Sequence, residues 1–221
     1  MFCLKMSHIH DIRMQSFQNS GVYLVTSGQM SSGRSTLDIV KFALAGGIRL
    51  VQLREKNLSR KDLMSLTVDV RRMTADSGAL LIINDMIDVA QEVGADGVHL
   101  GQNDFPVSQA RKLAPDLIIG ASTHSIGEAL KAQADGASYI NIGPIFPTKT
   151  KAWDDEFLGI DGLRKISAVT RVPFTVMGGI KKHHIPELKA AGARIVAVVT
   201  EITAADNPEN AARTLLSLMT P

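Results

Sequence analysis

Eight short apolar runs alternate with longer amphipathic stretches along this chain of 221 residues. The runs are rich in Val, Ile and Leu and lack the polar alternation of strands that have one solvated face. Such runs predict strands buried on both faces of a parallel sheet. The predicted strands cover residues 22–26, 50–55, 80–85, 97–101, 118–123, 139–146, 173–179 and 195–200.

The intervening stretches carry the signals of helices. In residues 59–76, Leu63 and Val70 stand at helical spacing, and Ser59 and Asp62 occupy the positions of a capping box. A Gly-Ala pair precedes three of the predicted strands, where glycine supplies the left-handed stop that a tight turn from helix to strand needs. These pairs lie at residues 94–95, 136–137 and 192–193.

Eight strands that alternate with helices predict an α/β structure with a closed parallel sheet, the (β/α)8 or TIM barrel. An open doubly wound sheet is the alternative. The lack of a Gly-x-Gly-x-x-Gly opening and of any linker favours a single barrel domain over residues 21–221, preceded by an N-terminal extension over residues 1–20. In a closed barrel the carboxyl ends of the strands build the active site. Polar residues at those ends are therefore the site candidates.

Composition excludes several classes of partner. A net charge of +2 is too small to indicate nucleic acid or an anionic membrane surface. No apolar run approaches the ~20 residues of a membrane span, and residues 1–20 lack the apolar core of a secretory signal. The single cysteine, Cys3, fits a reducing compartment, so we expect a cytoplasmic protein. Whether copies of the chain form a homo-oligomer stays open.

The second predicted strand ends in the sequence Gln52-Leu53-Arg54-Glu55-Lys56. Alternation along a strand points Gln52, Arg54 and Lys56 to one side. Arg54 can bind phosphate oxygens through its bidentate fork, and Lys56 adds a point charge. The alternative is that Arg54 and Glu55 form an ion pair at the rim of the barrel.

Carboxylates follow the next two strands. Asn84 and Asp85 end the third strand, and Asp104 follows the fourth. Carboxylates on adjacent strand ends suit a shared Mg²⁺ that keeps water ligands and accepts phosphate oxygens of a substrate. The alternative for each aspartate is an N-cap of the following helix.

Hydroxyl groups and a histidine follow the fifth strand. Ser122 can contact phosphate, whereas Ser125 is better placed to cap the helix that begins near Ile126. His124 has the chemistry of an acid or base, although a single histidine in a loop is more often structural.

The loop after the sixth strand contains Thr148, Lys149, Thr150 and Lys151. Two hydroxyls and two ammoniums in four residues can hold a phosphorylated ligand, although such a loop, taken alone, is more often solvated surface. The ends of the seventh and eighth strands add Gly178-Gly179 and Val199-Thr200, where these barrels often bind phosphate. The clusters together predict two anionic ligands, a metal-bound diphosphate and a monophosphate.

These motifs, taken in this order, resemble the thiamine-phosphate synthase (thiamine-phosphate pyrophosphorylase) family. The resemblance runs over residues 22–203 and rests on five elements. Thr200 departs from the serine that is usual in the family but keeps the hydroxyl. The elements are QLREK at 52–56, Asn84-Asp85, the HLGQxD pattern ending at Asp104, STH at 122–124 and GPIFPTxTK at 143–151.

The resemblance implies a ligand for each cluster. The residues it assigns to hydroxymethylpyrimidine diphosphate are Gln52, Leu53, Arg54, Glu55, Lys56, Asn84, Ser122 and Lys151. The metal ligands for Mg²⁺ would be Asp85 and Asp104. The residues it assigns to the thiazole phosphate are Thr148, Lys149, Thr150, Gly179, Val199 and Thr200.

The resemblance also implies a reaction between phosphorylated small molecules. The thiazole nitrogen attacks the methylene carbon of the pyrimidine as pyrophosphate leaves, with a dissociative path favoured by the electron-rich aminopyrimidine. Arg54, Lys56 and Lys151 would neutralise the leaving group. Two alternatives are a thiazole tautomerase, in which His124 would transfer the proton, and a barrel that binds thiamine precursors without turnover.

Overall fold

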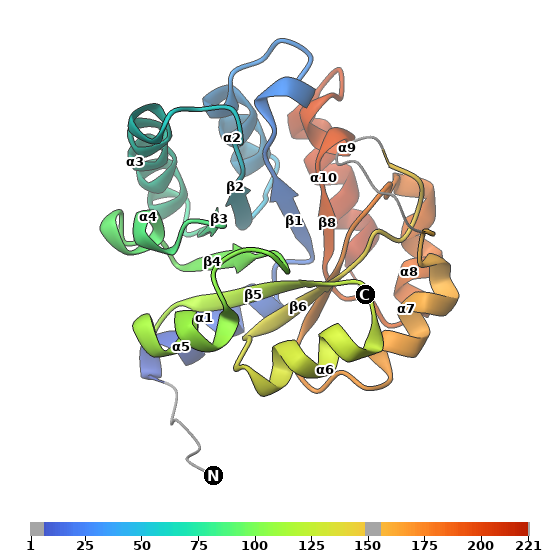
Figure 1. Cartoon of the computed structure of the whole chain (residues 1–221). Helices are drawn as coiled ribbons and strands as arrows, with labels where there is room; N and C mark the ends of the chain where they lie inside the picture. Colours follow the sequence, from blue (N-terminus) through green and yellow to red (C-terminus); the bar gives the residue numbers. More distant parts are fainter. Residues whose placement is uncertain (1–6, 149–155, 221) are drawn as a thin grey trace.

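The chain folds into a closed barrel of eight parallel strands in sequence order, as a computed structural model describes for residues 7–148 and 156–220 (Figure 1). Each strand pairs with the next, and β1 pairs with β8. The predicted TIM barrel is confirmed and the open sheet is wrong. The strands are β1 (Val22–Val25), β2 (Leu50–Leu53), β3 (Leu80–Asn84), β4 (Gly97–Leu100), β5 (Ile118–Thr123), β6 (Tyr139–Ile142), β7 (Phe174–Val176) and β8 (Val196–Val198).

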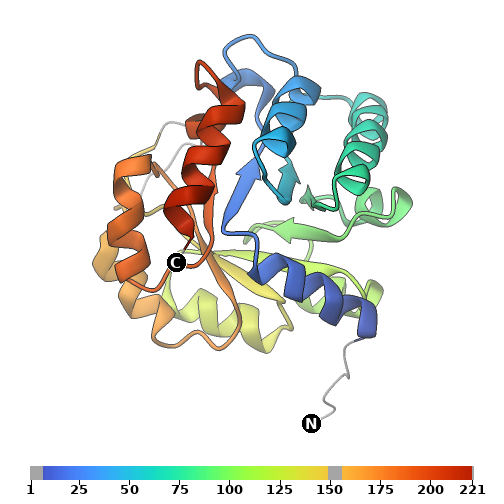
Figure 2. The same cartoon turned by 180° about the vertical axis from the view of Figure 1, so that it is seen from behind.

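Helices surround the barrel, as Figures 1 and 2 show from opposite sides. In α3 (Arg60–Asp76) the Ser59 hydroxyl accepts a hydrogen bond from the Asp62 N–H at 3.2 Å, so the predicted cap is confirmed. The other helices after β1 are α2 (Thr36–Ala45), α4 (Ile87–Glu92), α5 (Val107–Leu113), α6 (Ile126–Ala134), α7 (Gly159–Ser167), α8 (Ile185–Ala190), α9 (Thr200–Thr203) and α10 (Pro208–Met219). Short 3₁₀ turns cover Gly28–Met30 and Lys182–His184.

Alternation along the strands divides the buried residues into two cores. In β1, Leu24 packs between the sheet and the helices, whereas Tyr23 and Val25 point into the barrel. Tyr139 of β6 points into the barrel as well. The outer core is almost wholly aliphatic, but the interior contains tyrosine rings whose hydroxyls need hydrogen-bond partners.

An additional helix, α1 (His8–Gln18), precedes the barrel. The sequence predicts only an extension over residues 1–20, so this helix was not predicted. Its Phe17 is fully buried and belongs to the interior core together with Tyr23 and Tyr139. Figure 2 shows α1, in blue, lying against the barrel. It therefore contributes to the barrel core.

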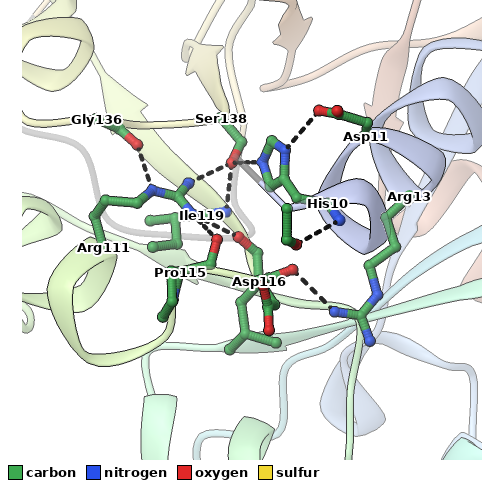
Figure 3. Close-up of polar contacts among 11 residues, drawn as sticks. His10, Asp11, Arg13, Arg111, Pro115, Asp116, Ile119, Gly136 and Ser138 are labelled. Carbon is green, nitrogen blue, oxygen red and sulfur yellow. Dashed lines mark hydrogen bonds and ion pairs between the residues drawn. The ribbon is translucent and has the colours of Figure 1, made fainter. Parts of the chain in front are cut away.

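Buried polar contacts also hold α1 in place (Figure 3). The Ser138 hydroxyl accepts hydrogen bonds from Arg111 at 2.6 Å and from the Ile119 N–H at 3.0 Å, and it lies 2.9 Å from His10 Nε2. Since two donors already occupy the Ser138 oxygen, its own proton points to His10 Nε2. The His10 ring in α1 is thus neutral when docked. Farther along the helix, Arg13 pairs with the Asp96 carboxylate at 3.2 Å.

Candidate active site

A cavity lies at the carboxyl ends of the strands, where the closed barrel predicts an active site. It is lined by residues from strand ends and loops around the barrel. Those that we singled out in the sequence and that line it are Gln52, Arg54, Lys56, Asn84, Asp85, Asp104, Ser122, His124, Thr148, Gly178, Gly179, Val199 and Thr200. The alternation along the second strand is therefore correct, since Gln52, Arg54 and Lys56 share one side.

Some of the predicted residues do not line this cavity. Leu53 is buried in the core between sheet and helices. The Glu55 carboxylate accepts hydrogen bonds from the Gly28 N–H and the Thr36 hydroxyl, each at 2.8 Å, rather than pairing with Arg54. It joins the loops after β1 and β2. The remaining candidates, Lys149, Thr150 and Lys151, lie outside the described residues.

Asp85 adopts an uncommon backbone conformation at the end of β3. Its φ is +61°, a left-handed conformation that aspartate tolerates better than most non-glycine residues. Its N–H donates to the His99 carbonyl at 2.8 Å, and its carboxylate lies 3.5 Å from Lys56 Nζ. The helix after it is capped at Met86 without a side-chain bond, so Asp85 is not an N-cap.

Asp104 lies close enough to Asp85 to affect the pKa of the Asp85 carboxyl. Burial raises the pKa of Asp85, the neighbouring Asp104 carboxylate raises it further, and Lys56 opposes both effects. Asp104 accepts a hydrogen bond from the Gly101 N–H at 2.7 Å, and α5 has its N-cap at Pro106 instead. The cap alternative therefore fails for Asp104 too, and a cation between these carboxylates would relieve their repulsion.

The donor set fits Mg²⁺. Two carboxylates supply hard oxygen ligands and leave coordination positions for water and phosphate oxygens, as Mg²⁺ prefers. In residues 7–148 and 156–220, no group of three or more His, Cys, Asp or Glu side chains could hold a metal. A closed all-protein cage of the zinc type is therefore not formed by these residues.

The end of β5 combines a helix cap with a cavity residue. The Ser125 hydroxyl accepts a hydrogen bond from the Glu128 N–H at 3.2 Å, which confirms that Ser125 caps α6. His124 Nδ1 lies 2.5 Å from the Gly143 carbonyl oxygen, which can only accept. In the neutral ring Nδ1 thus carries the proton, and a backbone carbonyl holds the histidine in its place at the cavity wall.

The double glycine after β7 is required by packing. Gly178 has φ of +102°, and a Cβ there would lie 2.5 Å from Pro144 Cα. Gly179 has φ of +62°, and a Cβ there would lie 2.3 Å from the Pro147 carbonyl oxygen. Only glycine lets the loop after β6 lie this close to β7. That contact brings Thr148 to the same cavity as Gly179.

Other inward-facing residues line the cavity but were not assigned a role from the sequence. His99 lies within a motif that we used, yet only Asp104 of that motif was interpreted. Asn141 and Met177 also line the cavity. Strand alternation could have identified these residues from the sequence, because alternate positions along a barrel strand face the interior.

Comparison with known proteins identifies the family. The model of the thiamine monophosphate synthase family matches residues 22–202. Thiamine-phosphate synthase from Caldicellulosiruptor saccharolyticus is 41% identical over 203 residues, which cover 91% of this chain and 92% of the relative. The enzyme of the same name from Chloroflexus aurantiacus is 40% identical over 216 residues, which cover 98% of this chain and 96% of the relative.

Solved structures agree. Thiamine phosphate pyrophosphorylase from Pyrococcus furiosus superimposes with a TM-score of 0.84 at 33% identity, covering 92% of this chain and 97% of that chain. A 3-hexulose-6-phosphate synthase superimposes with a TM-score of 0.68 at 20% identity, a likeness of fold alone. The resemblance drawn from the sequence motifs is confirmed. This chain belongs to the thiamine monophosphate synthase family.

Proposed function

We propose that the cavity condenses 4-amino-2-methyl-5-hydroxymethylpyrimidine diphosphate with hydroxyethylthiazole phosphate, giving thiamine phosphate and pyrophosphate. The observation that carries this proposal is the convergence of Arg54, Lys56, Asp85 and Asp104 on one cavity at the carboxyl end of the barrel. Two cations and a pair of carboxylates suit a metal-bound diphosphate. A tautomerase acting on the thiazole phosphate alone would not need these groups.

The residues of the chain have distinct tasks in this reaction. Arg54 and Lys56 balance the charge that develops on the leaving diphosphate, a task that we extend to Lys151 from the family pattern. Asp85 and Asp104 would hold Mg²⁺, which supplies further positive charge to the departing pyrophosphate when bound. Gln52, Asn84 and Ser122 orient the pyrimidine. The path is dissociative, and the attacking thiazole nitrogen carries no proton, so the bond-forming step needs no side-chain base.

The thiazole phosphate occupies the opposite side of the cavity in this proposal. Thr148 and Thr200 offer hydroxyl donors, and Gly179 and Val199 offer backbone near the phosphate. Lys149 and Thr150 extend this set by the family pattern. The partners we propose are thus phosphorylated small molecules, without nucleic acid or membrane.

Among the helices of the described ranges, none combines the length and apolar character that a membrane crossing requires. We propose the cytoplasm as the compartment, because the single cysteine suits a reducing environment.

One assay tests the reaction. Purified protein is mixed with both phosphorylated precursors and Mg²⁺, and pyrophosphate and thiamine phosphate are measured together. We expect equal amounts of both products, no turnover in EDTA, and a loss of at least about 100-fold in Asp104→Ala. Asp88→Ala is the matched control, since Asp88 is an exposed residue of α4 that pairs with Arg60 of α3. Change of the thiazole phosphate without pyrophosphate release would instead establish the tautomerase.

A further inference from the structure

A chain of hydrogen bonds crosses the barrel interior directly beneath the cavity. Gln52 Nε2 donates to the Tyr23 hydroxyl at 2.8 Å, and that hydroxyl lies 3.0 Å from the hydroxyl of Tyr139. The Tyr139 hydroxyl lies 2.8 Å from His99 Nδ1, and His99 Nε2 lies 3.0 Å from Ser122 Oγ. This polar chain joins Gln52 of β2 to Ser122 of β5 through Tyr23 of β1, Tyr139 of β6 and His99 of β4. Its two ends and His99 line the cavity, and the two tyrosines lie beneath it.

The barrel is built around the polar chain. Tyr23 and Tyr139 are fully buried, with ring centroids 6.3 Å apart in an edge-to-face arrangement. A Cβ on Gly120 would lie 2.2 Å from Tyr139 Cζ, so β5 needs a glycine at this inward position. From below, Phe17 of α1 packs against Tyr139 at 4.4 Å. Burial raises the pKa of both tyrosines, so both hydroxyls keep their protons at neutral pH.

The number of protons fixes the direction of each hydrogen bond. Because Gln52 Nε2 donates to Tyr23, the single Tyr23 proton goes to the oxygen of Tyr139. The Tyr139 proton then goes to His99 Nδ1, and a neutral His99 donates from Nε2 to Ser122. The Ser122 proton is thereby left to point away from His99. Ser122 lines the cavity, which the proton can reach.

The same count ties the polarity of Gln52 to that of Ser122. Its amide nitrogen is used by Tyr23, and among the described residues no donor reaches its Oε1. Exchanging the amide nitrogen and oxygen would reverse every bond of the polar chain and turn the Ser122 proton toward His99. If Gln52 and Ser122 both presented donors to the cavity, or both presented acceptors, one buried group within the polar chain would be left unpaired, which is costly. The two ends therefore always differ in polarity.

We propose that Tyr23, Tyr139 and His99 are positioning residues that couple Gln52 to Ser122, so that the cavity presents an acceptor, Gln52 Oε1, and a donor, the Ser122 hydroxyl. This proposal rests on the proposed function, because the aminopyrimidine is complementary to such a pair. Its exocyclic amino group donates and its ring nitrogens accept. The polar chain thus sets how the ring lies before the diphosphate leaves.

A double-mutant cycle tests the coupling. The KM for the pyrimidine diphosphate is measured in Gln52→Met, Ser122→Ala and the double variant, first in the wild-type background and then with Tyr139→Phe. We expect the two changes to be non-additive in the wild type by at least about fivefold, and additive once Tyr139→Phe has broken the polar chain. Tyr139→Phe alone should raise this KM and leave the KM for thiazole phosphate unchanged.

Controls separate the possible failures. Thr67→Val removes a buried hydroxyl in α3 that does not line the cavity, and it should leave both KM values unchanged. If Tyr139→Phe does not fold, Tyr23→Phe breaks the neighbouring link. A wild type without turnover would contradict the proposed function. An active wild type with an additive cycle would overturn only the coupling.

Nitrogen NMR of the His99 ring tests the direction of the hydrogen bonds in the polar chain. At a pH where the ring is neutral, the wild type should carry the proton on Nε2. Tyr139→Phe should shift the ring toward a mixture of tautomers, because Nδ1 has lost its donor. A wild-type ring protonated on Nδ1 would overturn the assigned direction of the polar chain.

Discussion

At the scale of single residues, the role that we propose for Asp85 as a metal ligand conflicts with the stability of the folded protein. Burial and the neighbouring Asp104 raise its pKa, so its ionisation opposes folding at neutral pH. Any stabilisation from this group is present below the pKa of the unfolded state and is lost as the pH rises through the folded value. The site thus holds an unfavourable charge that a bound cation would compensate.

Asp85→Asn should therefore stabilise the protein without metal and abolish turnover. Asparagine keeps the size of the side chain and tolerates the left-handed backbone, but it removes the repulsion with Asp104. A gain on the order of 1 kcal/mol would raise Tm by about 2–4 °C in a protein of this size. Thermal unfolding in EDTA at pH 7.5 measures it. A lower Tm than that of the wild type would show that the pair with Lys56 outweighs the repulsion.

The comparison of His124 with Arg54 separates the synthase from the tautomerase. His124→Ala should retain measurable synthase activity, because the ring is held by the Gly143 carbonyl and no base is needed at the bond-forming step. Arg54→Ala should cost more, since it strips charge from the leaving diphosphate. Steady-state kcat/KM measured for both variants distinguishes the two activities. A dead histidine variant beside an active arginine variant would favour proton transfer, worth about 10²–10⁴-fold.

Sequence reasoning found much of the cavity but not all of its residues' contacts. Alternation along β2 correctly placed Gln52, Arg54 and Lys56 on one side. It could not show that Glu55 accepts hydrogen bonds from Gly28 and Thr36, because the loop after β1 is brought there only by the tertiary fold. A sequence motif shows which charged residues are present, but it does not show their partners. The partners of a loop carboxylate are residues distant in the sequence.

At the scale of elements, α1 shows a helix that the spacing of apolar residues does not predict. Its buried residues, His10, Met14 and Phe17, follow helical spacing, but one of them is a histidine. Its opposite face exposes Ile9 and Ile12, so apolar residues lie on both sides of the helix. The eight strands were predictable because burial on both faces leaves a continuous apolar run. The docking of α1 depends on the finished barrel.

Docking of α1 should make the stability of the protein depend on pH. Burial lowers the pKa of His10 first of all, the charge of Arg111 lowers it further, and Asp11 opposes both. Since the folded pKa lies below the unfolded value of about 6.5, the unfolded state binds the proton more tightly. Stability is then complete above about pH 6.5 and falls as the pH drops below it, by at most about 1.4 kcal/mol per pH unit from this group.

Thermal unfolding between pH 8 and pH 5 measures this dependence. His10→Gln should flatten the fall below pH 6.5, and His8→Gln, a change at the exposed first residue of α1, should not. An equal slope in the wild type and His10→Gln would assign the pH dependence to other groups.

At the scale of the whole molecule, the two ends of the barrel are connected through its interior. Phe17 closes the end where α1 docks, and it packs against the same tyrosine rings that lie beneath the cavity. Phe17→Ala should destabilise the protein by about 3–5 kcal/mol, because it leaves a void under Tyr139. It should also raise the KM for the pyrimidine diphosphate more than that for thiazole phosphate.

Phe17→Leu keeps most of the volume and is the matched variant. Denaturant unfolding and steady-state kinetics on both variants give the result. Equal changes in the two KM values would mean that the void loosens the barrel as a whole.

The polar chain has a consequence for how the strands find their partners. Strands of Val and Ile that are buried on both faces tolerate sliding, since one aliphatic residue replaces another. A slip of β4 by one residue would place Val98 or Leu100 where His99 now meets Tyr139. That slip would leave the buried Tyr139 hydroxyl without its His99 partner, which is costly. The side chains that we propose to orient the pyrimidine thus also specify the shear of the barrel, and a misaligned sheet would be destabilised before any substrate is bound.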